Sequence, residues 1–373
     1  MKYCKKCVMP DTRPHIVFNE DGVCDACVSA EGKSKDIDWF TRYSELESLL
    51  RRYRLKSSTE YDCIVPVSGG KDSHYQTWIL KHEFNMSPLA VTFAQCAMTP
   101  LGQSNLDSLR EIGVDHILFT PDPIIYRKLA REGLKRVGDS CWPCHVGIFT
   151  VPVQVAVKFN IPLIVWGENG QQEYGGPAWH RDESVLDRRW VEEFCLLGNR
   201  VDAMTTVEGI TLSDLKPYIY PSDKDIKKVG VTGIYLGYFM KWDAREQIQF
   251  IKEKTNFNTS PSPTVGTYTD FENLDGKWYG FHDWLMYLKY GFGRATSHAC
   301  IDIRNRRLTR ERAVVLVNNN EGKFPKEYFK EFLDFIWMSE DEFDEVCELF
   351  ANKSIFEKDS KGHLVKRKEA VLC

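Results

Sequence analysis

Residues 66–73 read PVSGGKDS and stand between a short apolar run and a segment with helical character. Ser68, Gly69 and Gly70 permit a tight turn whose backbone N–H groups point at an anion, and a helix N-terminus adds partial positive charge. Lys71 supplies a fixed cation, while Asp72 and Ser73 lie in the first helical turn, where they can cap the helix or bind ligand. The spacing differs from that of a Walker A loop. The segment therefore predicts a phosphate-binding loop of another kind.

The cysteines form a second set of residues whose types and spacing could carry chemistry. The chain has 12 Cys, and six of them fall into three C-x-x-C pairs. Cys4, Cys7, Cys24 and Cys27 give the spacing C-x2-C-x16-C-x2-C, which can close a tetrahedral Zn²⁺ site with four thiolates. Residues 1–30 are too few to hold a hydrophobic core of their own. We therefore expect a zinc-ribbon module that a structural zinc ion holds together.

The composition limits the classes of protein. The chain has 373 residues, 43% of them hydrophobic and 27% charged, which excludes a disordered chain, a collagen and a coiled coil. A net charge of -4 predicts no nucleic-acid partner through the overall field. No apolar run approaches the roughly 18–20 residues that cross a bilayer, and the N-terminus lacks the apolar region of a signal peptide. We expect a cytoplasmic protein with no membrane contact.

The elements that must position these residues alternate between strand and helix. Apolar runs at 61–67, 88–94, 114–120 and 161–167 are separated by helical segments, which predicts an α/β fold with a parallel sheet covered on both faces. Segment 231–239 is a further candidate strand. Trp39, Tyr43, Leu46, Leu50 and Tyr53 mark one face of an amphipathic helix.

The rest of the chain is predicted to be a loop followed by helices. Residues 255–280 are predicted to form a long functional loop, and the region from 281 is predicted to be mostly helical. Within that region, Asp302 and Arg304 are predicted to alternate on a short strand, and a structural salt bridge is an equally good interpretation of the two charges. The last dozen residues are predicted to be mobile. We place the domain boundaries at 1–30 (ribbon), 31–58 (connecting helix), 59–255 (sheet domain) and 256–373 (helical region).

Ligands of nucleotide-binding α/β sheets lie at the carboxyl ends of the strands. Besides the loop at 68–73, these ends carry Thr92 and Phe93 on the second strand and Gly167 and Glu168 after the fourth. We therefore expect all of these residues at one edge of the sheet. Glu168 is a candidate to hold Mg²⁺ or to activate an amine.

The loop resembles the SGGxDS loop of the PP-loop ATP pyrophosphatases, which have an adenine nucleotide alpha hydrolase-like fold. The resemblance implies that ATP is cleaved between its α and β phosphates and that residues 68–73 bind the pyrophosphate. It also implies that Thr92 and Phe93 lie against the adenine, with Gly167 at the nucleotide site. Mg²⁺ is implied as the partner of the phosphates.

A closer resemblance extends from Met1 to about Phe350. The four-cysteine ribbon, SGGKDS, C-x-x-C-H, GEN-x-x-x-E-Y-G and GFGRATSHACIDIR resemble the N-acetyl sugar amidotransferases of O-antigen and flagellar-glycan biosynthesis. These enzymes convert an acetamido group of a sugar to an acetamidino group, and a separate glutaminase with a cyclase-like partner supplies the ammonia. The resemblance implies roles for Lys71 in charge stabilisation, for Asp72 and Glu168 at Mg²⁺, for Glu173 toward ammonia and for Arg294 toward a phosphate or sugar carboxylate.

Cys141 and Cys144 form the third pair and are candidate metal ligands, with His145 beside them. Some tRNA-thiolating PP-loop enzymes carry a C-x-x-C in this region around an iron–sulfur cluster, with a third cysteine, for which Cys195 and Cys300 are candidates here. A second zinc site and a pair of packed thiols are the alternatives. A tRNA-thiolating enzyme is accordingly the second functional hypothesis, against which the low net charge argues.

Overall fold

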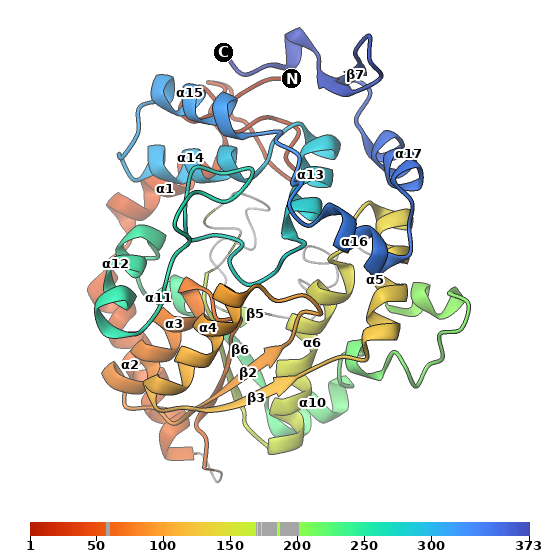
Figure 1. Ribbon diagram of the computed structural model, residues 1–373. Coiled ribbons are helices and arrows are strands. Elements are labelled where there is room, and N and C mark those ends of the chain that lie inside the picture. The colour runs from red at the N-terminus through yellow and green to blue at the C-terminus, as the bar shows by residue number, and fades with distance from the viewer. Residues whose placement is uncertain (57–59, 169, 171–172, 174–184, 187–200) are drawn as a thin grey trace.

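A computed structural model describes residues 1–56, 60–168, 170, 173, 185–186 and 201–373. Cys195 and most of the polar segment 171–176 lie outside the described residues. In Figure 1 the sheet and its helices form the lower part of the molecule, and the two chain termini lie side by side at the top, next to α14 and α15.

One sheet holds six strands in the order β3-β2-β1-β4-β6-β5. Their bounds are β1 Cys63–Pro66, β2 Pro88–Phe93, β3 Asp115–Phe119, β4 Leu163–Trp166, β5 Val185–Leu186 and β6 Thr232–Tyr235. Five strands run parallel and β5 pairs antiparallel at the edge. The predicted α/β fold with a parallel sheet is confirmed. Segment 231–239 is a strand only in its first half, because α11 begins at Leu236.

The helices fall into three groups along the chain. The N-terminal pair is α1 Asp25–Asp36 and α2 Trp39–Lys56. The sheet region contains α3 Lys71–Trp78, α4 Pro100–Ser108, α5 Pro123–Val137, α6 Trp142–Phe159, α10 Asp223–Val229, α11 Leu236–Phe239 and α12 Ala244–Lys254, with short turns η1 Ile79–Glu83, η2 Leu109–Ile112, η4 Val201–Thr206 and η5 Lys216–Tyr218. The C-terminal region contains α13 Tyr279–Tyr290, α14 Arg294–Arg304, α15 Arg310–Asn320, α16 Phe329–Ile336 and α17 Glu340–Phe350, then β7 Phe356–Lys358, β8 Leu364–Lys366 and η6 Lys368–Ala370.

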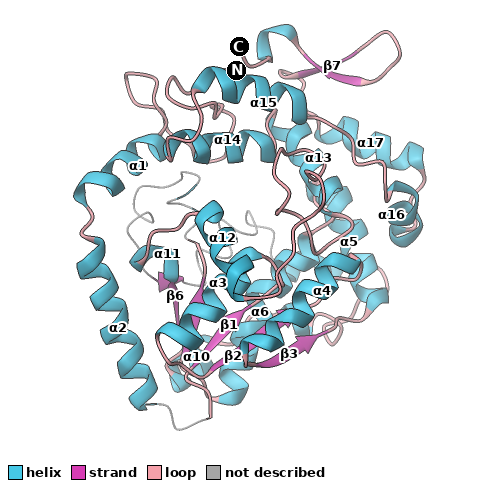
Figure 2. Ribbon diagram, turned by 60° about the vertical axis from the view of Figure 1, so that its left-hand side comes forward, coloured by secondary structure: helices cyan, strands magenta, loops and turns pink. Residues whose placement is uncertain are grey.

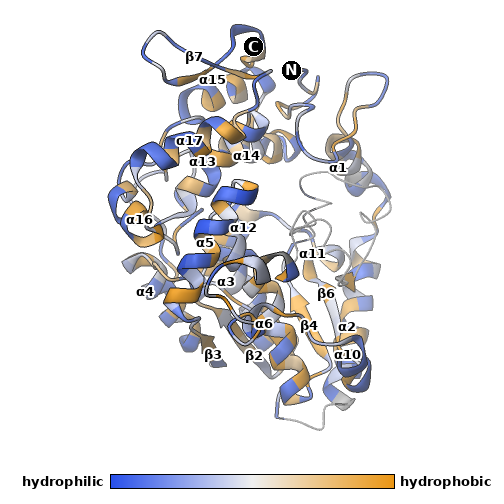
Figure 3. Cartoon of the chain, turned by 90° about the vertical axis from the view of Figure 1, so that its right-hand side faces the viewer, coloured by the Kyte–Doolittle hydropathy of each residue, from blue (hydrophilic) through white to orange (hydrophobic). Residues whose placement is uncertain are grey.

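Both faces of the sheet are covered, because alternate side chains of a strand point to opposite faces. Ile64 and Leu89 belong to the buried cluster that also holds residues of α5 and α6. Val65 and Ala90, their neighbours in sequence, belong to the cluster formed with α2, η1 and α4. Figure 3 shows the central strands coloured as hydrophobic between these layers. The fold is therefore a three-layer arrangement whose loops are free to build a site at one edge.

The N-terminal module packs against the C-terminal region rather than against the sheet. Cys4 and Cys24 share a buried cluster with Phe292 and Ala299, although these two pairs of residues are far apart in the sequence. Figure 2 shows α1 beside α14, while α2 runs down the flank of the sheet domain. The predicted amphipathic helix is confirmed, since Leu46 and Leu50 are buried. The helix therefore connects two layers of the molecule.

Two predictions for the C-terminal region are wrong. The last dozen residues are not mobile, because β8 pairs with β7, Leu372 is buried, and Lys366 Nζ donates to the carbonyl of Gly291 at 2.6 Å. That carbonyl lies just beyond the end of α13, where a cation is favoured. Asp302 and Arg304, predicted to alternate on a strand, lie on α14. The buried residues Ala295 and Ala299 are four positions apart, a spacing that is typical of a helix with one buried face.

None of the single helices that the structure describes is long and apolar enough to cross a membrane; α5 and α6 pass together by length and composition but are bent by 119° at their break.

Candidate active site

The loop after β1 has the geometry of an anion cradle. Gly69 has φ +86°, and a Cβ there would lie 2.9 Å from the backbone nitrogen of Leu106, so that only glycine fits. Ser73 Oγ accepts from the backbone N–H of Ser68 at 2.8 Å, which closes the loop on itself. Helix α3 begins at Lys71, and its N-cap residue Gly70 provides no capping side chain. The N-terminus of α3 is thus left to a ligand.

Lys71 joins this loop to the C-terminal region. Its Nζ lies 2.8 Å from Asp72 Oδ2 and 2.8 Å from Oε1 of Glu272, which belongs to the long loop before α13. Burial opposes ionisation of Glu272, but Lys71, His298 and Arg294 outweigh it and lower the pKa of this carboxyl to about 2. Glu272 is therefore ionised at neutral pH and fixes the end of the Lys71 side chain.

A pocket lies where three parts of the chain meet. The sheet domain contributes Lys71 and Glu168, and the start of α12 contributes Trp242 and Arg245. Ala244 also lies at the start of α12. The remaining lining residues are Glu173 and, from the C-terminal region, Thr269, Phe271, Glu272, His298, Ile301, Asp302 and Arg307. The loop 255–278, which Figure 1 shows passing above α3 and α4, brings Thr269 to Glu272 to this edge of the sheet. The predicted long loop is thus part of the site.

Two carboxylates of the sheet edge are crowded. Burial, followed by the negative charge of Asp72, raises the pKa of Glu168 to about 8 even though Lys71 acts in the opposite direction. Asp72 Oδ1 is buried and has no hydrogen-bond partner among the described residues. Burying a carboxylate oxygen without a donor or cation is costly. Lys71 reaches only the other oxygen of Asp72, so the pair is arranged to accept a further positive charge at Asp72 Oδ1 and Glu168.

Asp302 organises the opposite wall of the pocket. Its carboxylate accepts two hydrogen bonds from Arg245, at 2.9 and 2.6 Å, and one from Arg307 at 2.8 Å. The hydroxyl of Tyr268 donates to it at 2.8 Å. Arg307 also donates to Asp243 at 2.6 Å. Two guanidinium groups are thereby held at the pocket wall in fixed orientations.

His298 lies between these two walls. Its Nδ1 lies 2.7 Å from Thr267 Oγ1, and its Nε2 lies 3.8 Å from Glu272 Oε1. Burial lowers the pKa of His298 to about 4, although Glu272 acts in the opposite direction. The imidazole is therefore neutral at pH 7 and can exchange a hydrogen bond with a ligand without a change in charge.

Glu173 lines the pocket, and Gly167 precedes the lining residue Glu168. Oε1 of Glu173 accepts from Lys33 Nζ of α1 at 2.6 Å. Gly167 follows β4, and a Cβ there would lie 3.0 Å from the side-chain oxygen of Gln76 and 3.1 Å from the ring of Trp242. A close approach of backbone and side chains thus requires a small residue at 167.

Arg294 is placed differently from the expectation that it binds a phosphate or a sugar carboxylate. Its Nε and Nη2 donate to Asp283 at 2.9 and 3.0 Å, and its Nη1 lies 3.8 Å from Glu272 Oε2. Asp283 is buried and needs this cation. Arg294 is therefore not a lining residue of the pocket, and its positive charge stabilises the carboxylate of Glu272.

Thr92 and Phe93 occupy the carboxyl end of β2 but make contacts within the chain. The hydroxyl of Thr92 donates to the carbonyl of Val67 at 2.7 Å. The ring of Phe93 stacks on Phe119 with centroids 5.8 Å apart and packs where Gly147 leaves space. Both side chains are buried. A contact with adenine at this strand end would use the backbone or require these side chains to move, and this role stays a prediction.

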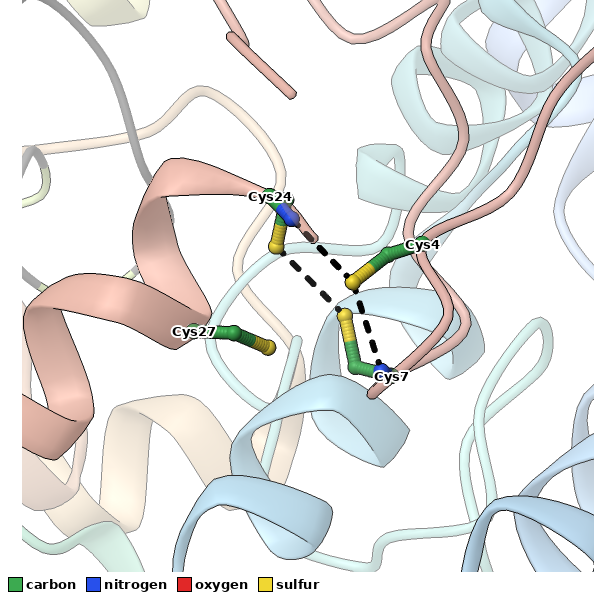
Figure 4. Close-up of side chains that lie close together, drawn as sticks. All are labelled: Cys4, Cys7, Cys24 and Cys27. Atoms are coloured by element: carbon green, nitrogen blue, oxygen red, sulfur yellow. Dashed lines mark hydrogen bonds between the residues drawn. The ribbon is translucent and has the colours of Figure 1, made fainter. Parts of the chain in front are cut away.

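The four N-terminal cysteines converge on one point, as Figure 4 shows. All four are buried, and their sulfurs lie within 4.8 Å of one another. The sulfurs of Cys7 and Cys24 are 3.7 Å apart, close to the roughly 3.8 Å edge of a tetrahedron with metal–sulfur bonds of about 2.3 Å. The backbone N–H of Cys24 points at Cys4 Sγ at 3.2 Å. The group fits a tetrahedral metal.

The third pair does not meet the cysteine that was considered as its partner. Cys300 lies in the cluster around the N-terminal cysteines, within hydrogen-bonding reach of Cys7, whereas Cys141 and Cys144 lie in a different buried cluster, which contains residues of α5, α6 and α13. The hypothesis of an iron–sulfur cluster that joins Cys300 to Cys141 and Cys144 is therefore wrong. Cys195, the other candidate, lies outside the described residues.

Several pocket residues were not expected from the sequence. Glu272, Arg245, Arg307 and Trp242 carry no motif, and their positions depend on how the C-terminal region folds over the sheet. The one available signal was the length of loop 255–280, which pointed to a functional segment without indicating a residue.

Comparisons with known proteins give three kinds of similarity. Residues 265–370 match the family described as LPS biosynthesis protein WbpG-like, C-terminal domain. The uncharacterized protein MJ1599 of Methanocaldococcus jannaschii is 25% identical over 166 residues, which are 44% of this chain and 58% of that protein. This chain thus spans less than two thirds of the length of that relative.

Two solved structures are similar at a greater distance. The NH3-dependent NAD synthetase from Campylobacter jejuni is 10% identical, with a TM-score of 0.31, over 52% of this chain and 92% of that chain. The NMN synthetase from Francisella tularensis is 14% identical, with a TM-score of 0.29, over 62% of this chain and 100% of that chain. Similarity at this level carries no functional inference. The match over residues 265–370 agrees with the resemblance drawn from the sequence motifs: this part of the chain is similar to the C-terminal domain of WbpG-like LPS biosynthesis proteins.

Proposed function

We propose that the protein is an ATP-dependent amidotransferase that converts an acetamido group of a bacterial surface-glycan sugar precursor to an acetamidino group. The observation that carries the proposal is the contact of Lys71 with Glu272. It joins the phosphate loop to the WbpG-like C-terminal domain in one pocket. The pocket therefore has one wall suited to a nucleotide and another supplied by an LPS-biosynthesis domain.

The proposed reaction has two steps, adenylation of the amide oxygen and displacement of AMP by ammonia. The amide oxygen attacks the α phosphorus of ATP, the bond to the β phosphate breaks, and an O-adenylated imidate and pyrophosphate form. Ammonia then attacks the imidate carbon, AMP leaves with the former amide oxygen, and the nitrogen loses a proton to give the amidine. Adenylation is needed because the oxygen of an unactivated amide is a poor leaving group. Lys71 and the backbone N–H groups of 68–73 stabilise the charge on the phosphates.

Mg²⁺ fits the two carboxylates at the sheet edge. Asp72 Oδ1 is buried without a hydrogen-bond partner among the described residues, and Glu168 is crowded by the charge of Asp72. Oxygen ligands of this type are those that Mg²⁺ prefers. When bound, Mg²⁺ would neutralise phosphate charge. Glu173 and Glu272 lie on the pocket wall, where carboxylate oxygens can accept N–H hydrogen bonds from ammonia.

We further propose that the N-terminal cysteine group holds a structural Zn²⁺, because four buried thiolates at tetrahedral spacing suit this ion. The ammonia would come from a glutaminase with a cyclase-like partner, a proposal that rests on the family resemblance.

The test is product analysis of ATP turnover. Purified protein is incubated with Mg²⁺-ATP, an ammonium salt and a panel of acetamido sugar nucleotides. We expect AMP and pyrophosphate only when ammonia and the matching sugar are both present, and a product in which NH has replaced oxygen by mass. Formation of ADP and phosphate would exclude the proposed cleavage. AMP formation that needs tRNA and a sulfur donor would favour a thiolating enzyme.

A further inference from the structure

A second group of metal-ligand side chains lies away from the pocket, where α6 begins. Asp139, Cys141 and His282 each offer a ligand atom, and these atoms lie within 4.8 Å of one another. His282 Nδ1 is 2.9 Å from Asp139 Oδ1, and His145 Nδ1 is 3.2 Å from Asp139 Oδ2. The two imidazole rings are 5.1 Å apart at their centroids. Three potential ligands thus surround the Asp139 carboxylate: Cys141 and His282 within one group, and His145 at the other oxygen.

The chemistry of this donor set suits a divalent transition metal. One thiolate, one carboxylate and two neutral imidazoles balance the two positive charges of the ion, so that a partly buried site is neutral when filled. Mixed sulfur, nitrogen and oxygen donors select borderline cations, of which Zn²⁺ is the most common in such surroundings. The backbone N–H of Cys141 donates to Asp139 Oδ1 at 2.8 Å, which orients the carboxylate.

We propose that Asp139, Cys141 and His282, with His145 as the fourth ligand, form a second binding site for Zn²⁺ or a similar divalent transition metal. The site differs from the one that the C-x-x-C spacing suggests. Both cysteines line a small cavity beside Gln95 and Tyr279, but only the sulfur of Cys141 is grouped with the ligand atoms of Asp139 and His282. The pair therefore divides, and only its first cysteine binds the metal.

The site joins two parts of the chain. Asp139 and Cys141 lie between α5 and α6 of the sheet domain and His145 lies in the first turns of α6, whereas His282 lies on α13 of the WbpG-like domain. A bound ion would hold these two parts together at a point separate from the Lys71–Glu272 contact. This role does not depend on the proposed reaction.

The experiment is a zinc determination by mass spectrometry on the purified full chain and four variants. We expect about two zinc ions per chain in the wild type, because each complete ligand set holds one ion. Cys141→Ser and His282→Gln should each lose one ion, whereas the matched control Cys144→Ser should lose none. Cys24→Ser reports on the N-terminal site. Thermal unfolding of each variant shows whether it is folded.

The wild type alone supplies a second readout if a variant does not fold. Zinc X-ray absorption should give an average of about 2.5 sulfur ligands per ion, because one site has four thiolates and the other has one. One zinc per wild-type chain with about four sulfur ligands would overturn the proposal. An equal loss in Cys141→Ser and Cys144→Ser would also overturn it, in favour of a C-x-x-C site.

Discussion

The two halves of the candidate pocket differ in how they are built. The phosphate-loop half is local: residues 68–73 form one turn that follows β1, and its geometry depends on Gly69 and on the hydroxyl of Ser73. The C-terminal half is assembled from the loop before α13, from α14 and from the start of α12, and it depends on ion pairs around Asp302. The local half should serve the nucleotide, and the assembled half should serve the sugar and the ammonia.

The largest effect is expected from the residue that connects the two halves. Lys71→Ala should reduce AMP formation by roughly 10³-fold or more, because the developing charge on the phosphates loses its cation. The measurement is kcat/KM for ATP, with Lys277→Ala as the control, since Lys277 forms an ion pair with Glu331 away from the pocket. A Lys71→Ala variant that retains wild-type turnover would remove the phosphate loop from the mechanism.

The next prediction tests whether the two halves of the pocket bind different substrates. Asp302→Asn leaves Arg245 and Arg307 without their shared carboxylate, and loss of one member of such a buried cluster should cost about 3 kcal/mol of unfolding free energy. In protein that stays folded, KM for the sugar should rise while KM for ATP stays unchanged. Asp107→Asn, at the exposed pair with Arg110, is the control. A rise in KM for ATP instead would contradict the division of the pocket.

A smaller effect is expected at Glu272, which belongs to the assembled half but contacts the local one. Glu272→Gln keeps the size of the side chain and removes the charge that fixes Lys71, so kcat should fall by roughly 30-fold, about 2 kcal/mol. The control is Glu331→Gln, an exposed carboxylate that pairs with Lys277 away from the pocket. Because Glu272 acts through Lys71, the double variant with Lys71→Ala should be no worse than Lys71→Ala alone. Additive losses would show that the two residues act separately.

The sequence was sufficient for the local half and insufficient for the other. A strand, a Gly-Gly turn and a helix start are neighbours in the chain, so residues 68–73 could be placed from their own pattern. The four central strands follow from continuous apolar runs for the same reason. Glu272 and Arg245 meet Lys71 and Asp302 only after residues far apart in sequence have packed, and no local pattern encodes that meeting. Asp302 shows the limit most clearly, because its ion-pair character was anticipated but its partners and its helix were not.

The smallest expected effect is a pH dependence of the unfolding free energy, which reports on the environment of His298 in the assembled half. Burial lowers the pKa of His298 to about 4, below the ordinary value of 6.5, so the folded state disfavours the protonated imidazole. Above pH 6.5 the imidazole is neutral in both the folded and the unfolded state, and stability is lost as the pH falls from 6.5 toward 4, by at most roughly 1.4 kcal/mol per pH unit. His298→Gln has no such proton and should remove this slope, measured as unfolding free energy in urea at pH 7, 6 and 5. His363→Gln, at a side chain that is 71% exposed, should leave the slope intact. A slope that is the same in wild type and His298→Gln would mean that the imidazole is solvated, and that the assembled wall of the pocket is more open than its contacts indicate.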